Sequence, residues 1–317
     1  MGLLSALSCS LHLLAASRPP GAGPIPAPPP PLPILFETDQ FAVVAKPPSV
    51  PCHRLEIETW GGKKRRRGRS GGRAIADPAA HIDGSGGVDP EGAVSVPTVL
   101  RRAEVTFPGR RIYLAHRLDA PTSGCLLIAF SPEAVREASA ALSDRGRKTY
   151  YALCRGGGKA LRERGTFVAG GDVRDSKGVR REAETEIEGL WGSDGPPRRC
   201  CLVRASPRTG RWHQVRQHLG RESFPIVGET RHHKDIGENR AWGEILEGLG
   251  HPRRVCLHCH RLEIEGGSGG IFDGGLDVKC PLPIDMQAMI NLTDWAGDAQ
   301  NTLPCLFEPF PKARVVP

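Results

Sequence analysis

Hydrophobic residues along this chain gather in short runs of strand length, separated by segments rich in glycine and proline. The run Phe41 to Ala45 is apolar throughout and leads into Lys46, Pro47 and Pro48. Because proline donates no backbone hydrogen bond, the two prolines must end this strand. Cys125 to Phe130 is a second continuous apolar run. Both runs predict buried strands.

A helix is predicted directly after the second run. Ser131 suits the N-cap, Pro132 suits the first helical position, and Glu133 places a negative charge in the first turn. Apolar residues then recur at helical spacing, at Ala134, Val135, Ala138, Ala141 and Leu142.

Further strand patterns follow with few helices between them. They lie at Thr149 to Cys154, Glu184 to Leu190, Cys200 to Val203 and Val255 to Ile264. Many strands with few intervening helices favour an antiparallel or mixed sheet over alternating strand and helix units. We therefore predict an α+β fold in a single domain, with a mixed, largely antiparallel sheet flanked by helices and loops.

Composition marks three segments off from this domain. Residues 1–33 contain no acidic residue and one Arg and end in a proline run, which is typical of a disordered tail or a targeting segment such as an organelle transit peptide. Residues 61–96 are first basic and then rich in Gly, Asp, Ser and Pro, which predicts a disordered insertion. We predict a folded domain over residues 34–300 around this insertion, and a C-terminal tail over residues 301–317.

The net charge of +8 comes almost wholly from one place. Seven basic residues and no acidic one lie between Lys63 and Arg73, and without them the chain has 36 basic against 35 acidic residues. This excludes a uniformly cationic protein that packages nucleic acid, so RNA would have to bind in a local groove. The basic run over residues 63–69 itself has three open interpretations: a nuclear import signal, a phosphate-binding arm or a solvated loop.

The cysteines and the hydropathy exclude two other classes of protein. The ten cysteines show no repeated spacing in this long chain, so we expect reduced thiols and no disulfide framework. The longest apolar stretch, Leu3 to Ala16, is interrupted by Ser and His and is shorter than the ~20 residues that span a bilayer. We expect no membrane-spanning helix.

Two patterns resemble metal or haem sites. Cys256-Leu257-His258-Cys259-His260 matches the short pattern for covalent haem attachment, but it overlaps a predicted strand. A zinc site that joins Cys256 and Cys259 to Cys200 and Cys201 would lack a second spaced pair. A haem or zinc redox protein is therefore a minor alternative, and we interpret His232-His233 as a surface loop.

A first candidate for chemistry is the segment His116-Arg117-Leu118-Asp119-Ala120-Pro121-Thr122-Ser123-Gly124, just before the second apolar run. Loops at strand ends often hold catalytic groups. Asp119, flanked by basic residues in a turn rich in hydroxyls, could serve as a nucleophile or base. Taken alone, the same Asp is more typical of a plain turn residue.

A second candidate is the segment Thr209 to Leu219. Thr209 is an N-cap candidate, and a helical wheel places Trp212, Val215 and Leu219 on one face together with Arg216. On that wheel Gln214 and Gln217 point away and His213 lies at the margin. An Arg among apolar positions must reach water or meet a carboxylate, and Asp119 is the candidate partner.

The third candidate is Lys148-Thr149-Tyr150-Tyr151-Ala152 at the start of a strand. Alternation puts Tyr150 and Tyr151 on opposite faces. One ring can then pack in the core while the other faces a pocket, where it could stack on a base.

Together these segments resemble the RluA-type family of RNA pseudouridine synthases, in that family's order. The elements that carry the resemblance are Phe41 to Pro48, His116 to Gly124, Lys148 to Ala152, Glu182 to Thr185, Thr209 to Arg216, and Leu257-His258 ahead of Leu262. Within the family, Cys52-His53-Arg54, Asp119 to Thr122, Phe224 to Gly228 and Asn239-Arg240 are similar to the branch called tRNA pseudouridine synthase C.

The resemblance implies an enzyme that isomerises uridine in RNA without cofactor or metal. It places the essential catalytic carboxylate on Asp119, the ring that stacks on the target base on Tyr150, and the partner of the Asp on Arg216. Further RNA contacts are expected at His116, Arg117, Thr122, Arg211, His213 and Gln214. We expect a monomer that acts on tRNA or, less favoured, rRNA. The alternative on the same scaffold is a catalytically silent factor that binds or folds RNA.

Overall fold

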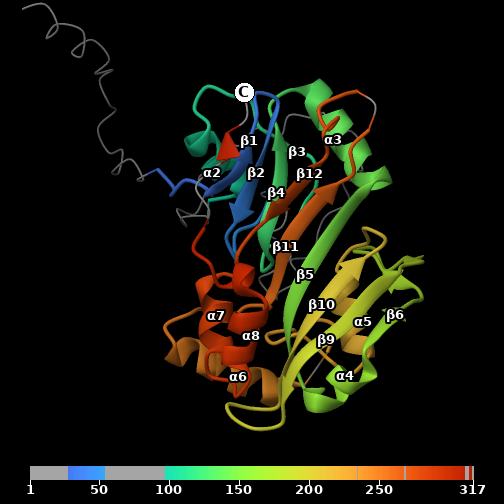
Figure 1. The fold of residues 1–317 in the computed structure, drawn as a ribbon, viewed down its shortest axis with the longest axis vertical. Coiled ribbons are helices and arrows are strands. Elements are labelled where there is room, and N and C mark those ends of the chain that lie inside the picture. Colours follow the sequence, from blue (N-terminus) through green and yellow to red (C-terminus); the bar gives the residue numbers. More distant parts are fainter. Residues whose placement is uncertain (1–27, 54–96, 234, 268, 311–313, 316–317) are drawn as a thin grey trace, which may run out of the picture.

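The computed structural model describes residues 28–53, 97–233, 235–267, 269–310 and 314–315 (Figure 1). The predicted insertion over residues 61–96 and all but the last six residues of the predicted N-terminal tail lie outside the described residues. The insertion, the N-terminal tail and the domain boundaries therefore stay predictions. Within the predicted C-terminal tail, Pro304–Leu306 form a 3-10 helix and Arg314–Val315 form a strand that pairs in the sheet.

One large sheet organises the described chain. Its strands are β1 (Ile34–Glu37), β2 (Phe41–Lys46), β3 (Tyr113–Leu114), β4 (Ser123–Ala129), β5 (Gly146–Arg155), β6 (Thr166–Ala169), β9 (Thr185–Ser193), β10 (Cys200–Pro207), β11 (Leu257–Ile264), β12 (Leu276–Lys279) and β13 (Arg314–Val315). The strand order is β13-β1-β2-β4-β11-β5-β10-β9-β6, with β3 paired to β4 and β12 to β11. A separate hairpin pairs β7 (Val173–Arg174) with β8 (Arg180–Arg181). The β1–β13 and β4–β11 pairs are parallel and the others are antiparallel, which confirms the predicted mixed, largely antiparallel sheet.

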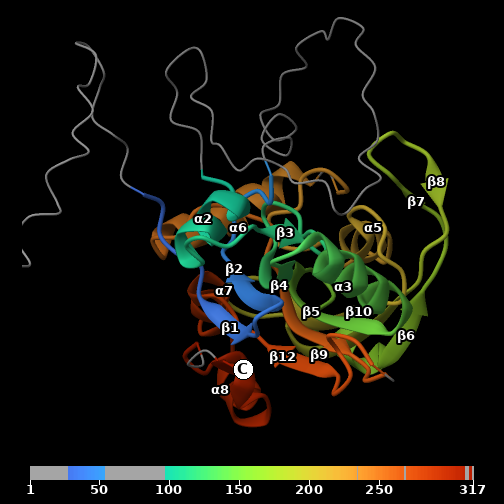
Figure 2. The same ribbon diagram turned by 90° about the horizontal axis from the view of Figure 1, so that it is seen from above.

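Helices cover the sheet and its ends. They are α2 (Val99–Thr106), α3 (Pro132–Asp144), α4 (Gly158–Arg164), α5 (Gln214–Arg221), α6 (Ile236–Gly248), α7 (Ile284–Ile290), α8 (Ala296–Thr302) and the short 3-10 helix η2 (Pro304–Leu306). The predicted start of α3 is confirmed, because the Ser131 side chain accepts a hydrogen bond from the Ala134 amide and the five predicted apolar positions are all buried. α3 packs on β4 and β5, α5 packs on β9 and β10, and both lie on the same side of the sheet (Figure 2).

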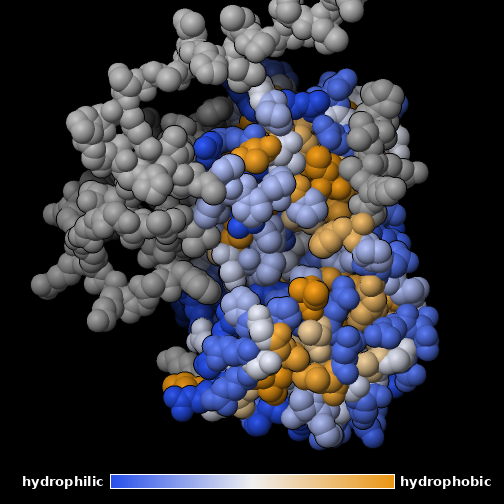
Figure 3. Space-filling model, turned by 90° about the vertical axis from the view of Figure 1, so that its left-hand side faces the viewer, coloured by the Kyte–Doolittle hydropathy of each residue, from blue (hydrophilic) through white to orange (hydrophobic). Residues whose placement is uncertain are grey.

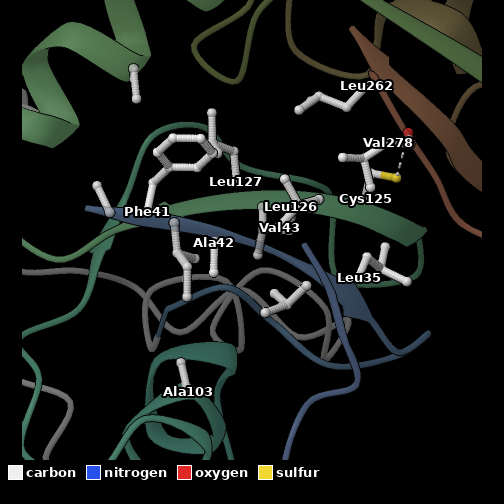
Figure 4. Packing of buried hydrophobic residues seen from close by; sticks show 14 of the residues in the cluster. Leu35, Phe41, Ala42, Val43, Ala103, Cys125, Leu126, Leu127, Leu262 and Val278 are labelled. Carbon is white, nitrogen blue, oxygen red and sulfur yellow. Dashed lines mark hydrogen bonds between the residues drawn. The ribbon is translucent and has the colours of Figure 1, made fainter. Parts of the chain in front are cut away.

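Two hydrophobic clusters meet along the middle of the sheet. The first lies around β2, β4, α2 and α3 and includes Phe41, Leu126 and Leu127, which pack together (Figure 4). The second lies around β5, β9, β10 and the helices α4 to α8. Tyr150 on β5 packs against both clusters, so this side chain lies where the two halves of the molecule join.

No described helix is long and apolar enough to cross a bilayer. On the face shown in Figure 3, where grey atoms leave it visible, hydrophobic residues form small groups between hydrophilic ones.

Gly124 allows β4 and β11 to approach each other. Its backbone has φ +116°, and a Cβ built there would lie 2.1 Å from the carbonyl oxygen of Cys259 on the neighbouring strand. Gly124 pairs with Lys46 on one side and Cys259 on the other. Any larger residue would therefore strain the strand that carries the predicted catalytic loop.

We expect Gly124→Ala to lower the free energy of unfolding by about 2–4 kcal/mol, since both the backbone conformation and the close contact are lost. The matched control is Gly109→Ala, where φ is +81° but nothing lies within 4 Å of the added Cβ. Urea unfolding followed by tryptophan fluorescence measures both variants. Equal destabilisation by the two substitutions would contradict the proposed role of the strand contact.

Candidate active site

The loop that carries Asp119 connects β3 to β4 and is held by a buried lysine. The Thr122 amide donates to the Asp119 carbonyl at 2.9 Å. Lys46, only 1% exposed at the end of β2, donates from Nζ to the carbonyls of Ala120 at 2.9 Å and Thr122 at 2.7 Å. A buried ammonium must be paired or fully hydrogen-bonded. The lysine that closes the first apolar run therefore fixes the backbone of the Asp119 turn.

A buried arginine holds the same loop from the other side. Arg254 donates from Nη1 to the Pro121 carbonyl at 3.2 Å and forms a two-pronged ion pair with Asp285, in which Nη2 lies 2.8 Å from Oδ1. Burial alone would raise the pKa of Asp285, but Arg254 lowers it below its ordinary value. Asp285 is therefore a carboxylate at neutral pH and keeps Arg254 in place.

Helix α5 begins later than the sequence pattern predicts. Its N-cap is His213, in the left-handed conformation with φ +50°, and the helix runs from Gln214 to Arg221. The predicted N-cap at Thr209 is wrong, because the Thr209 hydroxyl instead donates to Gln214 Oε1 at 2.7 Å. Trp212 precedes the helix, so a helical wheel does not describe the direction of its side chain.

The prediction that Gln214 and Gln217 point away is also wrong, since both are buried. Gln214 Oε1 accepts from the Arg211 amide at 3.0 Å, and its Nε2 donates to the Glu184 carbonyl at 2.8 Å. Gln217 is hydrogen-bonded to the backbone of Arg174 in both directions, at 2.9 and 2.8 Å. A helical wheel assumes that polar positions face solvent. That assumption fails here, because a buried amide whose hydrogen bonds are all made inside the protein is stable there.

Arg216 meets Asp119, as the wheel predicts. Arg216 Nη1 lies 3.2 Å from Asp119 Oδ2. Its Nε and Nη2 atoms bind the fully buried Glu229 carboxylate at 2.6 and 3.2 Å. Burial alone would lower the pKa of Arg216, but the two carboxylates raise it above its ordinary value. The buried Arg216 guanidinium therefore binds two carboxylates at once: the buried one of Glu229 and that of Asp119, which lines the cavity.

The Glu229 loop is fixed through its own backbone. The Glu229 side chain accepts from the amides of Arg231 at 2.7 Å and His232 at 3.0 Å. Its carbonyl accepts from Arg155 Nη2 at 3.1 Å and from Asn239 Nδ2 at 2.5 Å. The carboxylate that holds Arg216 is thus rigidly placed.

His213 lies against the ion pair and stays neutral. Its Nε2 is 3.1 Å from Arg216 Nη1 and 3.5 Å from Asp119 Oδ2. Burial, followed by the charge of Arg216, lowers the pKa of His213 far below its ordinary value. Nε2 therefore accepts from Arg216, and the proton sits on Nδ1, 2.9 Å from Nε2 of His232. The Trp212 ring stacks on His213 with 3.7 Å between the ring centroids, which holds the imidazole in this orientation.

Tyr150 and Tyr151 point to opposite faces of β5, as alternation predicts. Tyr151 is buried in the second cluster, whereas Tyr150 lines a cavity with Asp119 and Arg216. Burial, and then the neighbouring Cys259 thiol, raise the pKa of Tyr150 well above its ordinary value. The ring is therefore a neutral phenol at neutral pH.

The cavity lies between α3 and α5, over β5, and has a volume of about 530 Å³. Every predicted site residue lines it: Asp119, Tyr150, Arg216, His116, Arg117, Thr122, Arg211, His213 and Gln214. The volume suits a small-molecule-sized group such as a nucleoside. Predicted site residues from three distant parts of the chain thus meet in one cavity.

The predicted RNA-contact residues differ in their exposure and in their contacts within the protein. Arg117 and Arg211 are exposed at the cavity. His116 accepts from the Leu127 amide at 3.1 Å, and burial lowers its pKa well below the ordinary value. The four hydrogen bonds of Gln214 go to the protein. The RNA contacts of all these residues stay predictions.

The two metal-like patterns are spread through the core. Cys259 belongs to the first hydrophobic cluster and Cys256 to the second, while Nε2 of His258 and Nδ1 of His260 both bind the Cys280 carbonyl, at 2.9 and 2.7 Å. Among the described residues, no three His, Cys, Asp or Glu side chains are grouped to hold a metal ion. All nine described cysteines have free thiols.

Sequence reasoning missed the supporting charges Glu229, Lys46, Arg254 and Asp285. Glu229 directly follows the Phe224 to Gly228 element, which is the one local signal that could have pointed to it. The others lie far along the chain from the groups that they bind, so no local pattern indicates their partners.

We expect Glu229→Gln to lower the free energy of unfolding by about 3–5 kcal/mol, because it leaves a buried guanidinium without its main partner. The matched control is Glu188→Gln, which breaks an exposed ion pair with Arg204 and should cost less than about 1 kcal/mol. Urea unfolding compares the two. If both variants were destabilised equally, Glu229 would not be the anchor of Arg216.

Comparisons with known proteins place this sequence beside one family of enzymes. A sequence model of the RNA pseudouridylate synthase family matches residues 40–220. The tRNA pseudouridine synthase C of Salmonella typhi is 34% identical over 187 residues, which cover 53% of this chain and 70% of the relative. The protein of the same name from Yersinia pestis is 33% identical over 208 residues, which cover 61% of this chain and 77% of the relative.

Two solved structures share the fold. Human RNA pseudouridylate synthase domain containing 1 is 21% identical with a TM-score of 0.50, and covers 82% of this chain and 86% of its own. Human RNA pseudouridylate synthase domain containing 4 is 18% identical with a TM-score of 0.52, and covers 88% and 94%. With the family match spanning more than half of the sequence, the chain belongs to the RNA pseudouridylate synthase family and is a pseudouridine synthase.

Proposed function

We propose that this protein isomerises a specific uridine in RNA to pseudouridine, with Asp119 as the essential carboxylate, Tyr150 stacked on the base and Arg216 as the partner of Asp119. The observation that carries the proposal is the 3.2 Å contact between Arg216 Nη1 and Asp119 Oδ2, inside a cavity that Tyr150 also lines. A cation beside a carboxylate favours its charged form, which a nucleophile or base requires.

The reaction moves the bond from C1′ of the ribose to a different atom of the same base. The C1′–N1 bond breaks, the base turns, and C5 bonds to C1′ before its proton leaves. Asp119 either attacks the sugar or removes a sugar proton, and both roles use a carboxylate held at the cavity. The Tyr150 ring would keep the base in place while it turns.

The substrate is proposed to be tRNA, with rRNA as the less favoured choice. The names of the similar bacterial proteins support tRNA. The target uridine must leave its stack to enter the cavity, at a cost of a few kcal/mol that contacts to the RNA backbone must offset. The exposed side chains of Arg117 and Arg211 suit such contacts.

We expect Asp119→Asn to lower the single-turnover rate of pseudouridine formation by about 10⁴-fold, the scale seen when a catalytic group is removed. Carbodiimide mapping of tRNA and rRNA transcripts after incubation with purified protein measures the product. Asp298→Asn, at an exposed position in the first turn of α8, is the control and should keep full activity.

Equal product with Asp119→Asn and wild type would contradict the proposed role of Asp119. A wild-type protein that binds these RNAs but forms no product would instead favour the silent RNA-binding or folding factor.

A further inference from the structure

Lys148 shares the Tyr150 face of β5. Side chains two residues apart on a strand point the same way, and Gly146, Lys148 and Tyr150 all line the cavity. Gly146 has no side chain to cover the lysine. Lys148 is half-buried, so this lysine belongs to the wall of the cavity that also includes the proposed base-stacking ring.

The titratable neighbours of Lys148 do not neutralise it. Burial lowers the pKa of Lys148, and the neighbouring Cys259 thiol opposes that shift. Burial raises the pKa of Cys259 to about 12, so this thiol is protonated at neutral pH. His116 and Tyr150 are neutral there too, because burial lowers the pKa of the first and raises that of the second.

The carboxylates of the site are already engaged by Arg216. Glu229 binds it through two nitrogens and Asp119 through the third. A half-buried cation in a largely protein-lined cavity is costly unless a negative group arrives with the substrate.

The reaction itself produces such a group. When the C1′–N1 bond breaks, its electron pair stays on N1 of the uracil ring and spreads onto the carbonyl oxygens O2 and O4. The charge disappears when C5 bonds to C1′, the C5 proton leaves and N1 takes a proton from solvent. Between these two events the detached ring is an anion, whichever role Asp119 plays.

We propose that Lys148 is a further catalytic residue, whose ammonium binds a carbonyl oxygen of the detached uracil and stabilises its negative charge. This rests on the proposed function. A preorganised cation that meets charge only as it develops lowers the barrier directly. A phosphate contact is not needed from Lys148, because the exposed arginines Arg117, Arg208 and Arg211 line the same cavity and suit that role.

The test varies the leaving group. A tRNA transcript that the wild-type protein modifies is prepared with uridine or with 5-fluorouridine, whose fluorine withdraws electrons and stabilises the departing anion. The rate at which the starting nucleoside disappears at the target site is measured under single-turnover conditions, with enzyme at saturation. This readout does not require the C5 proton to leave.

We expect Lys148→Met to lower the single-turnover rate on the uridine RNA by about 10²–10³-fold, the usual effect of removing one charge-stabilising group. The rate on the 5-fluorouridine RNA should fall by a factor at least about tenfold smaller, because the better leaving group needs less stabilisation. Lys148→Arg keeps a cation and should recover most of the rate. Lys159→Met on α4, an exposed lysine outside the cavity, should leave both rates unchanged.

Equal losses for the two RNAs would overturn the role of Lys148, as would a loss that appears only as weaker, more salt-dependent RNA binding, which indicates a phosphate contact. If the wild-type protein modifies no tRNA or rRNA transcript, so that no such substrate can be prepared, the proposed function is overturned and this inference with it. Active wild type with equal losses overturns only the inference.

Discussion

Arg216 is a cation taken out of water and shared between two carboxylates, and the geometry of the site depends on this one interaction. Burying a guanidinium costs several kcal/mol unless good hydrogen bonds compensate. Glu229 supplies them through two oxygens, in a loop that Arg155 and Asn239 hold by its backbone. Only Nη1 is left to face the cavity, where it meets Asp119. The position of the Asp119 carboxylate therefore depends on the fully buried carboxylate of Glu229.

The loop that presents Asp119 is fixed by its peptide groups. Lys46 from β2 and Arg254 from the segment before β11 donate to the carbonyls of Ala120, Pro121 and Thr122. Both cations are buried, so their hydrogen bonds are strong and hard to exchange with water. The backbone of the turn is held from both neighbours of β4 in the sheet, and the Asp119 side chain lies against Arg216 and His213. Such support is what a preorganised site requires.

Sequence patterns sufficed where the determining contacts are local or periodic. The apolar runs predicted β2 and β4, the Ser131 cap predicted the start of α3, and alternation separated Tyr150 from Tyr151. The apolar face of α5 also pointed to a partner for Arg216. The wheel failed for Gln214 and Gln217, because it equates polar with exposed and these amides bind backbone carbonyls inside the protein. The predicted cap at Thr209 failed because its hydroxyl donates to the Gln214 side chain. The supporting roles of Lys46 and Glu229 were not predicted, because the groups that they bind are brought to them by the tertiary structure.

The most direct test of this account is a crystal structure of the Asp119→Asn variant bound to a tRNA that the wild-type protein modifies. The account predicts that the target uridine is unstacked from the RNA and lies in the cavity, with its base against the Tyr150 ring. The ribose C1′ or C2′ should then lie within about 3.5 Å of the side chain at position 119. Bound RNA with every uridine still stacked, or with the unstacked base in another part of the protein, would contradict it.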